Sequence, residues 1–216
     1  MTQIYPSLIS ADLLNLQREI ERLDPYVPGY HLDIMDFHYV PNLTWGPAFM
    51  DAIAGITKRT LWVHLMVDNP NMWVEKLQLP AGSILDFHIE KLEENKNIFN
   101  NIQNKSWQVS VAVSPKIDVE KTFSFLNAIT QVTIMSVEPG RSGQAFLPHV
   151  LSKVEALVDY RKKNNLKFSI AMDGGISEKN IKEISSLGVD RVAIAHALFS
   201  KPDPIKALQE IQKIIL

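Results

Sequence analysis

Eight short, mainly apolar runs recur along this chain, and a longer segment separates each run from the next. The runs lie at residues 4–10, 30–35, 60–67, 83–89, 108–114, 131–137, 167–173 and 190–196. Runs of this length and character are typical of strands that are buried on both faces of a parallel sheet. Their regular alternation with longer segments predicts an α/β protein.

The segments between the runs carry apolar residues at helical spacing, clearest in residues 11–24 and 147–165. Helix starts are also readable: Asp118 and Ser177 each precede a helical segment, and Pro204 stands in the first turn of the last one. Eight strand and helix units in one unbroken pattern favour a closed (β/α)8 TIM barrel with short loops. An open, doubly wound sheet is the alternative.

No stretch of the chain resembles a linker, so we expect one barrel domain spanning residues 1–216. The formal net charge of -2 gives no reason to expect nucleic acid or a membrane surface as a partner. The chain has no cysteine, which excludes disulfides, thiolate metal sites and a cysteine nucleophile. Without a signal-peptide pattern or a membrane-length apolar run, the sequence predicts a soluble, cytoplasmic protein.

Ionisable residues stand where the predicted strands end, which is where barrel enzymes carry their chemistry. His31 and Asp33 are two residues apart and therefore share one face of their strand. His64 lies in the third run, and Asp173 ends the seventh. A lone strand histidine is more often a hydrogen-bonded core residue than a ligand. Two imidazoles and two buried carboxylates together favour a cation, because unpaired buried charges are costly.

This donor set predicts one divalent metal ion per chain, which we expect to be zinc, iron, manganese or cobalt. Asp36 and His38 lie beyond the end of the second run, and we interpret them as residues that structure the loop.

Candidate phosphate-binding loops follow the last three runs, and the first two of them contain glycines. They read "EPGRSGQ" at residues 138–144, "DGG" at 173–175 and "AHALF" at 195–199. Backbone N–H groups in such loops can approach an anion, and the loops after strands seven and eight of a barrel often bind phosphate. The alternative is ordinary turn chemistry. Met35, Met66 and Met135 stand near strand ends, either as core filling or as an apolar lid over the site.

The chain resembles the ribulose-phosphate 3-epimerase family over nearly its whole length. The matching segments are "PSLISADLLNL", "HLDIMDFHYVPNLTWGP", "VHLMVDNP", "FHIE", "MSVEPGRSGQAFLPHVLSKV", "MDGGI" and "AIAHALF". The family is a (β/α)8 barrel that interconverts D-ribulose 5-phosphate and D-xylulose 5-phosphate with a bound divalent metal.

The resemblance implies metal ligands at His31, Asp33, His64 and Asp173, with the two aspartates doubling as the acid/base pair. It also implies a small sugar phosphate as the partner and a homo-oligomeric assembly. The expected substrate-binding residues are Ser7, Met35, His64, Met66, Met135, Gly140, Arg141, Ser142, Gly143, Gly174, Gly175, Ala195 and His196.

Several residues depart from the family pattern. Phe37 replaces a glycine, which would strain the backbone if φ is positive there. Arg141 and Ser142 stand where the family usually has Phe and Gly, and Ala195-His196 replaces Gly-Ser. These changes leave the metal and acid/base set intact but alter the phosphate end, where Arg141 and His196 could supply charged donors.

A different ketose phosphate, such as a hexulose phosphate, is therefore an alternative substrate. A lyase or decarboxylase on the same kind of barrel is a second alternative. It is disfavoured because the readable strand ends carry no lysine, Lys58 and Lys116 lying outside the central cluster. A diverged paralogue that binds a sugar phosphate without turnover is the third.

Overall fold

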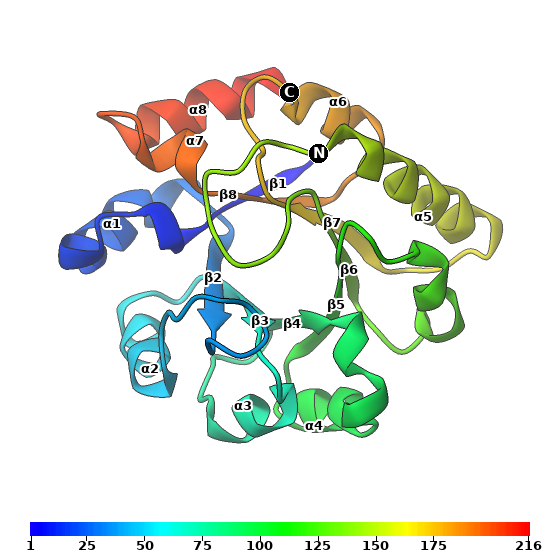
Figure 1. Cartoon of the computed structure of the whole chain (residues 1–216). Coiled ribbons are helices and arrows are strands. Elements are labelled where there is room, and N and C mark those ends of the chain that lie inside the picture. The colour runs from blue at the N-terminus through cyan, green and yellow to red at the C-terminus, as the bar shows by residue number, and fades with distance from the viewer.

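The computed structural model describes residues 1–216, and its centre is a ring of eight parallel strands (Figure 1). They are β1 (Gln3–Pro6), β2 (Gly29–Met35), β3 (Thr60–Met66), β4 (Ile84–His88), β5 (Gln108–Val113), β6 (Gln131–Met135), β7 (Ser169–Asp173) and β8 (Arg191–Ile194). Each pairs with its neighbour in sequence from β2 to β8, and β8 pairs with β1. A single bridge between Ser7 and His31 spans the remaining gap between β1 and β2. The predicted (β/α)8 architecture is confirmed.

Helices ring the strands on the outside (Figure 1). They are α1 (Leu16–Leu23), α2 (Pro47–Ile56), α3 (Pro70–Lys76), α4 (Ile98–Asn104), α5 (Leu151–Lys163), α6 (Ile181–Ser186), α7 (His196–Phe199) and α8 (Pro204–Ile214). Pro204 opens α8 as predicted, and Asp203 caps it by accepting from the Ile205 and Lys206 N–H groups. None of these helices combines the length and the hydrophobicity that a membrane-spanning segment needs.

Two predicted helices differ from the structure. The segment after Asp118 forms a 3-10 helix, Val119–Phe125, and Asp118 makes no side-chain cap. Thr122 contributes to this difference, because its hydroxyl donates to the Val119 carbonyl and competes with regular helical bonding. In the segment 11–24, the α-helix begins only at Leu16.

Alternate residues of each strand face opposite sides of the barrel wall, as β2 shows. Tyr30, Leu32 and Ile34 belong to the main core of 50 buried residues, which lies between strands and helices. The intervening His31 and Asp33 point into the barrel. A small apolar cluster fills the barrel interior, namely Tyr5, Trp62, Ile84, Ala171 and Ala193. Besides the groups at the mouth, the strands carry a buried polar layer inside the barrel, formed by Asp86, Ser110, Gln131 and Thr133.

Candidate active site

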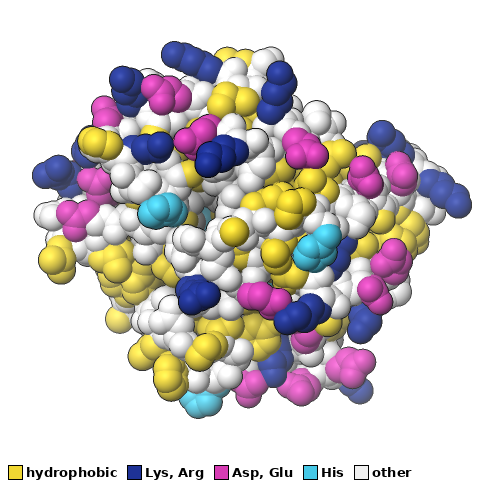
Figure 2. Space-filling view, turned by 45° about the horizontal axis from the view of Figure 1, so that its top comes forward, with side chains coloured by type: hydrophobic (Ala, Val, Ile, Leu, Met, Phe, Trp, Pro, Cys, Tyr) yellow, Lys and Arg dark blue, Asp and Glu magenta, His cyan; other side chains and the backbone are white.

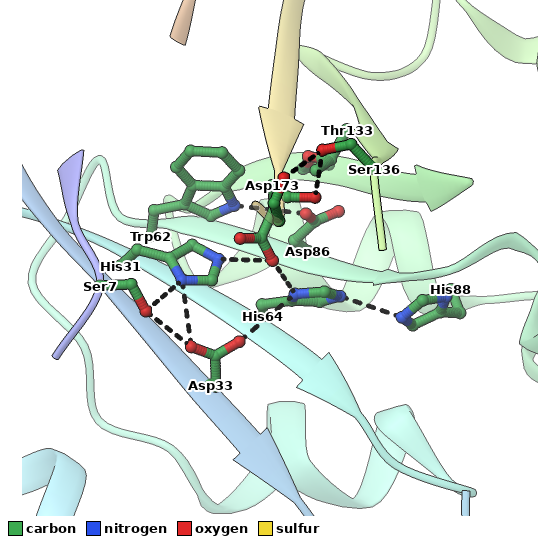
Figure 3. Close-up of polar contacts among 12 residues, drawn as sticks. Ser7, His31, Asp33, Trp62, His64, Asp86, His88, Thr133, Ser136 and Asp173 are labelled. Atoms are coloured by element: carbon green, nitrogen blue, oxygen red, sulfur yellow. Dashed lines mark hydrogen bonds and ion pairs between the residues drawn. The ribbon is translucent and has the colours of Figure 1, made fainter. Parts of the chain in front are cut away.

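Four side chains from three strands converge at the mouth of the barrel (Figure 3). His31 and Asp33 come from β2, His64 from β3 and Asp173 from the end of β7. One donor atom from each lies within 4.8 Å of all the others. His31 and His64 are fully buried, and the Asp33 side chain is only 8% exposed. The four predicted ligands thus form one cluster that could hold a metal ion.

The two carboxylates contact both imidazoles. His64 Nδ1 lies 3.3 Å from Asp173 Oδ2 and 3.8 Å from Asp33 Oδ1. On the other ring, His31 Nδ1 lies 3.3 Å from Asp33 Oδ2, and His31 Nε2 lies 3.8 Å from Asp173 Oδ2. Asp33 and Asp173 therefore face each other across the two rings.

Ser7, directly after β1, fixes the orientation of His31 and Asp33. The Ser7 hydroxyl donates its proton to Asp33 Oδ2 at 2.8 Å, so Ser7 Oγ accepts from His31 Nδ1–H at 3.2 Å. A neutral His31 then has its lone pair on Nε2, an atom that has no hydrogen-bond partner. His64 Nδ1 is likewise buried and unpartnered. Two orphaned imidazole nitrogens beside two carboxylates are the donor set that a divalent cation requires, so the residues fit the expected metal.

The charges of the metal-free cluster support one another. Burial disfavours the charged form of His31, but the carboxylates of Asp33 and Asp173 outweigh it and raise its pKa to about 9. Burial also opposes a charged His64, yet the contact with Asp173 raises its pKa. For Asp33, burial acts to raise the pKa, but the neighbouring histidines and Ser7 lower it. Without a metal, the neighbouring carboxylates therefore favour the protonated form of both imidazoles.

A cavity of about 310 Å³ opens above this cluster. Asp33 and Asp173 line it, and so does every predicted substrate-binding residue except His64, which lies beneath it. Met35, Met66 and Met135 are each only 2% exposed and form its apolar wall. The methionines thus have both of the roles considered from the sequence, because they are packed core side chains that also bound the cavity.

The loops after β6 and β7 form one end of the cavity. Gly174 and Gly175 have φ values of 113° and 62°, which favour glycine. A Cβ on Gly175 would lie 2.6 Å from the Phe146 N, so glycine also lets these two loops pack closely. Arg141 and His196 line the same end with exposed side chains. Two further cations there, Lys179 and Lys201, escaped the sequence analysis because neither stands at a strand end. Lys179 lies in the turn before α6, and Lys201 lies between α7 and α8.

The loop after β2 is structured by Asp36, in agreement with its predicted role. The Asp36 carboxylate accepts from the backbone N–H groups of His38, Tyr39 and Asp68. Burial would raise the pKa of Asp36, but these hydrogen bonds lower it. Phe37, between Asp36 and His38, has φ of 64° and is 66% exposed. The predicted strain at Phe37 is present.

We expect Phe37→Asn to raise the free energy of unfolding by about 0.5–1 kcal/mol, because asparagine tolerates the left-handed conformation better than phenylalanine. Urea denaturation measures the change. Phe37→Ala removes the same ring but keeps a Cβ in the strained conformation. Equal stability of the Ala and Asn variants would show that backbone strain is not the cause.

A second buried group lies beside the predicted ligands and was not assigned a role from the sequence. His88 Nε2 is 3.0 Å from His64 Nε2 (Figure 3). The other ring nitrogen of His88 contacts Ser114 Oγ. Burial, together with His64, lowers the pKa of His88 well below its usual value. Asp86 lies in the buried layer beneath, where burial raises its pKa and Trp62 Nε1–H donates to it at 3.3 Å.

Fold and site together define a (β/α)8-barrel enzyme with a potential cation centre below an open cavity. A model of the Ribulose-phosphate 3 epimerase family matches residues 3–199. Ribulose-phosphate 3-epimerase of Schizosaccharomyces pombe is 32% identical, with 99% of this chain and 94% of the relative covered. The enzyme of the same name from Treponema pallidum is 34% identical, with 91% of each covered. This chain therefore belongs to the ribulose-phosphate 3-epimerase family and is an isomerase of the racemase and epimerase class.

Solved structures of lower identity share the fold. One is 3-hexulose-6-phosphate synthase from Salmonella typhimurium, with a TM-score of 0.66, 15% identity and coverage of 99% of this chain and 98% of that one. At this identity the likeness concerns the barrel alone.

Proposed function

We propose that this chain inverts C3 of a ketose phosphate, interconverting D-ribulose 5-phosphate and D-xylulose 5-phosphate. The observation that carries the proposal is the placement of Asp33 and Asp173. These two carboxylates come from β2 and β7, face each other across His31 and His64, and both line the cavity. Inversion of a carbon next to a carbonyl needs one group on each face to remove or return a proton.

In this mechanism one aspartate takes the C3 proton, and the other returns a proton to the opposite face. The roles exchange in the reverse direction. Ser7 holds one oxygen of Asp33 by donating to Oδ2, which leaves Oδ1 free to point toward the reacting carbon. The methionine wall around the cavity limits access of water to the deprotonated substrate.

His31, Asp33, His64 and Asp173 would hold one divalent cation, of zinc, iron, manganese or cobalt. It would supply a Lewis acid for the negative charge that develops on the substrate oxygens, a contribution of several kcal/mol. The two histidines offer their unpartnered nitrogens, and each aspartate has a second oxygen left for proton transfer.

The substrate phosphate would lie at the end of the cavity formed by the loops after β6, β7 and β8. Backbone N–H groups of Gly143, Gly174 and Gly175 could approach it, and the side chains of Arg141 and His196 reach the same end. Because Arg141, Ser142, Ala195 and His196 depart from the family pattern, a hexulose phosphate is the second candidate substrate.

Proton exchange tests the proposal. We would incubate the metal-loaded protein with D-ribulose 5-phosphate in heavy water and follow the C3 hydrogen by NMR. The expected result is deuterium at C3 together with D-xylulose 5-phosphate, and no exchange in a metal-stripped control. Exchange seen only with another ketose phosphate would correct the substrate. Silence across a panel of ketose phosphates, with metal bound, would overturn the epimerase function in favour of binding without turnover.

Assembly and location stay proposals as well. We propose a homo-oligomer, for which light scattering of the purified protein is the test.

The proposed cytoplasmic location is supported by one observation, since a relative from Oryza sativa subsp. japonica is named a cytoplasmic isoform of the enzyme. Charged side chains of both signs are interspersed over the face shown in Figure 2, so this face carries no uniform positive charge.

A further inference from the structure

The segment "FHIE", residues 87–90, contains two ionisable residues that the proposed mechanism does not use. His88 ends β4 and is 1% exposed, and Glu90 follows in the next turn. Neither lines the substrate cavity, and neither does their partner Ser114, which comes just after β5. Burial of an imidazole destabilises the fold unless its ring nitrogens form hydrogen bonds. The hydrogen bonds of His88 therefore need an explanation.

These hydrogen bonds form a chain that leads from the proposed metal centre toward solvent. His64 Nε2 lies 3.0 Å from His88 Nε2, and His88 Nδ1 lies 3.1 Å from Ser114 Oγ. The Ser114 hydroxyl donates to Glu90 Oε1 at 2.6 Å. The Glu90 side chain is 31% exposed, so the chain begins at a partly hydrated carboxylate and ends at a fully buried ring.

The surrounding residues hold this chain in place. Lys153 of α5 donates to the backbone carbonyls of Ser114, Pro115 and Ile117, at 3.1, 2.7 and 2.6 Å. The Tyr39 ring packs against His88 with 4.8 Å between centroids. The rings of His64 and His88 are stacked, with centroids 5.0 Å apart. Backbone and rings are thus fixed on both sides of the hydrogen-bonded atoms.

The number of available protons fixes which atom donates in each hydrogen bond of this series. A carboxylate only accepts, so Ser114 gives its single proton to Glu90 and must accept from His88 Nδ1–H. A neutral His88 then has only a lone pair at Nε2, and His64 must donate to it through Nε2–H. The reverse direction fails, because Ser114 would need two protons to donate to both Glu90 and His88.

This direction of hydrogen bonding determines whether the other nitrogen of His64, Nδ1, carries a proton. With its proton at Nε2, a neutral His64 has a free lone pair at Nδ1, the unpartnered atom that faces Asp33 and Asp173. A proton at Nδ1 would instead block that atom as a ligand. His31 is held in the opposite tautomer by Ser7, with its lone pair at Nε2. Each imidazole is thereby set to present the nitrogen that faces the cluster.

We propose that His88, Ser114 and Glu90 are positioning residues that fix the ring and tautomer of His64 so that Nδ1 is the metal ligand. Partners of this kind commonly raise metal affinity by 10–100-fold. The inference rests on the metal centre under the proposed function. Its test uses no substrate, so it stands or falls independently of turnover.

The direct test is NMR of the zinc-loaded protein with 15N-labelled histidine. We expect a proton bonded to His64 Nε2, with a scalar coupling across the hydrogen bond to His88 Nε2, and zinc at His64 Nδ1. A proton on His88 Nε2, or zinc at His64 Nε2, would overturn the proposal. This measurement needs only the unmodified protein, so it decides the question even if the variants do not fold.

Zinc affinity, measured by competition with a chelator, gives a second readout. We expect His88→Phe, which keeps a ring but removes the acceptor, and Ser114→Ala to weaken zinc binding by about 10–100-fold. His88→Gln offers an amide oxygen as acceptor and should restore most of the affinity. His149→Gln, at an exposed histidine, is the matched control. A folded His88→Phe protein with unchanged zinc affinity would contradict the proposal.

Discussion

Replacement of Asp173 by asparagine is expected to lower kcat/KM for epimerisation by about 10³-fold or more, and Asp33→Asn should do the same. Positioned acid/base groups contribute about 10²–10⁴-fold, and each aspartate serves one face of the substrate. The measurement is a coupled assay of ketose phosphate turnover at saturating metal. Metal content is determined in parallel, because both residues belong to the predicted ligand set.

The two variants should also differ from each other in a way that a general loss of structure cannot produce. Each keeps one carboxylate, so one variant should exchange the C3 hydrogen of ribulose 5-phosphate in heavy water and the other that of xylulose 5-phosphate. Asp86→Asn is the matched control, since Asp86 is buried in the same barrel but does not line the cavity. It should change kcat/KM by less than about tenfold. Identical exchange by both variants would exclude the two-carboxylate mechanism.

The barrel was predictable because strands that are buried on both faces appear in the sequence as short, mainly apolar runs. Each run is mainly apolar, because one face packs on helices and the other faces the barrel interior, and all eight predicted strands are present. Helix type was harder to predict. The segment Val119–Phe125 has helical spacing, but Thr122 bonds back to the chain and the segment forms a 3-10 helix. Local side-chain hydrogen bonds of this kind do not appear in a hydrophobic pattern.

The metal cluster could also be anticipated, because strand ends of a barrel meet at one mouth. The sequence did not reveal the hydrogen-bonded residues that position His64 in this cluster. His88 stands in an apolar run and looks like an ordinary core residue until its neighbours are known. Its partner Ser114 comes from the end of the next strand, β5, and only the barrel brings Ser114 within hydrogen-bonding distance of His88 and Glu90. For Lys179 and Lys201, the fold rather than any motif places them at the cavity.

Removal of the metal is expected to abolish turnover and to reverse the pH dependence of stability. In the metal-free protein, burial opposes a charged His31, but Asp33 and Asp173 raise its pKa to about 9. An unfolded histidine titrates near 6.5. The stabilisation from protonated His31 is therefore full below about pH 6.5 and is lost as the pH rises to about 9. The loss is roughly 2–4 kcal/mol in the free energy of unfolding.

The metal-loaded protein should show the opposite slope, because its histidine ligands must be unprotonated and protons compete with the metal as the pH falls. Urea denaturation of both forms between pH 6 and 9.5 measures the two slopes. His31→Gln should flatten the curve of the metal-free protein, whereas His149→Gln, at the surface, should leave it unchanged. Parallel curves for the two forms would mean that His31 carries no extra proton in the metal-free protein. The cluster would then not be held together by the charges of His31, Asp33 and Asp173.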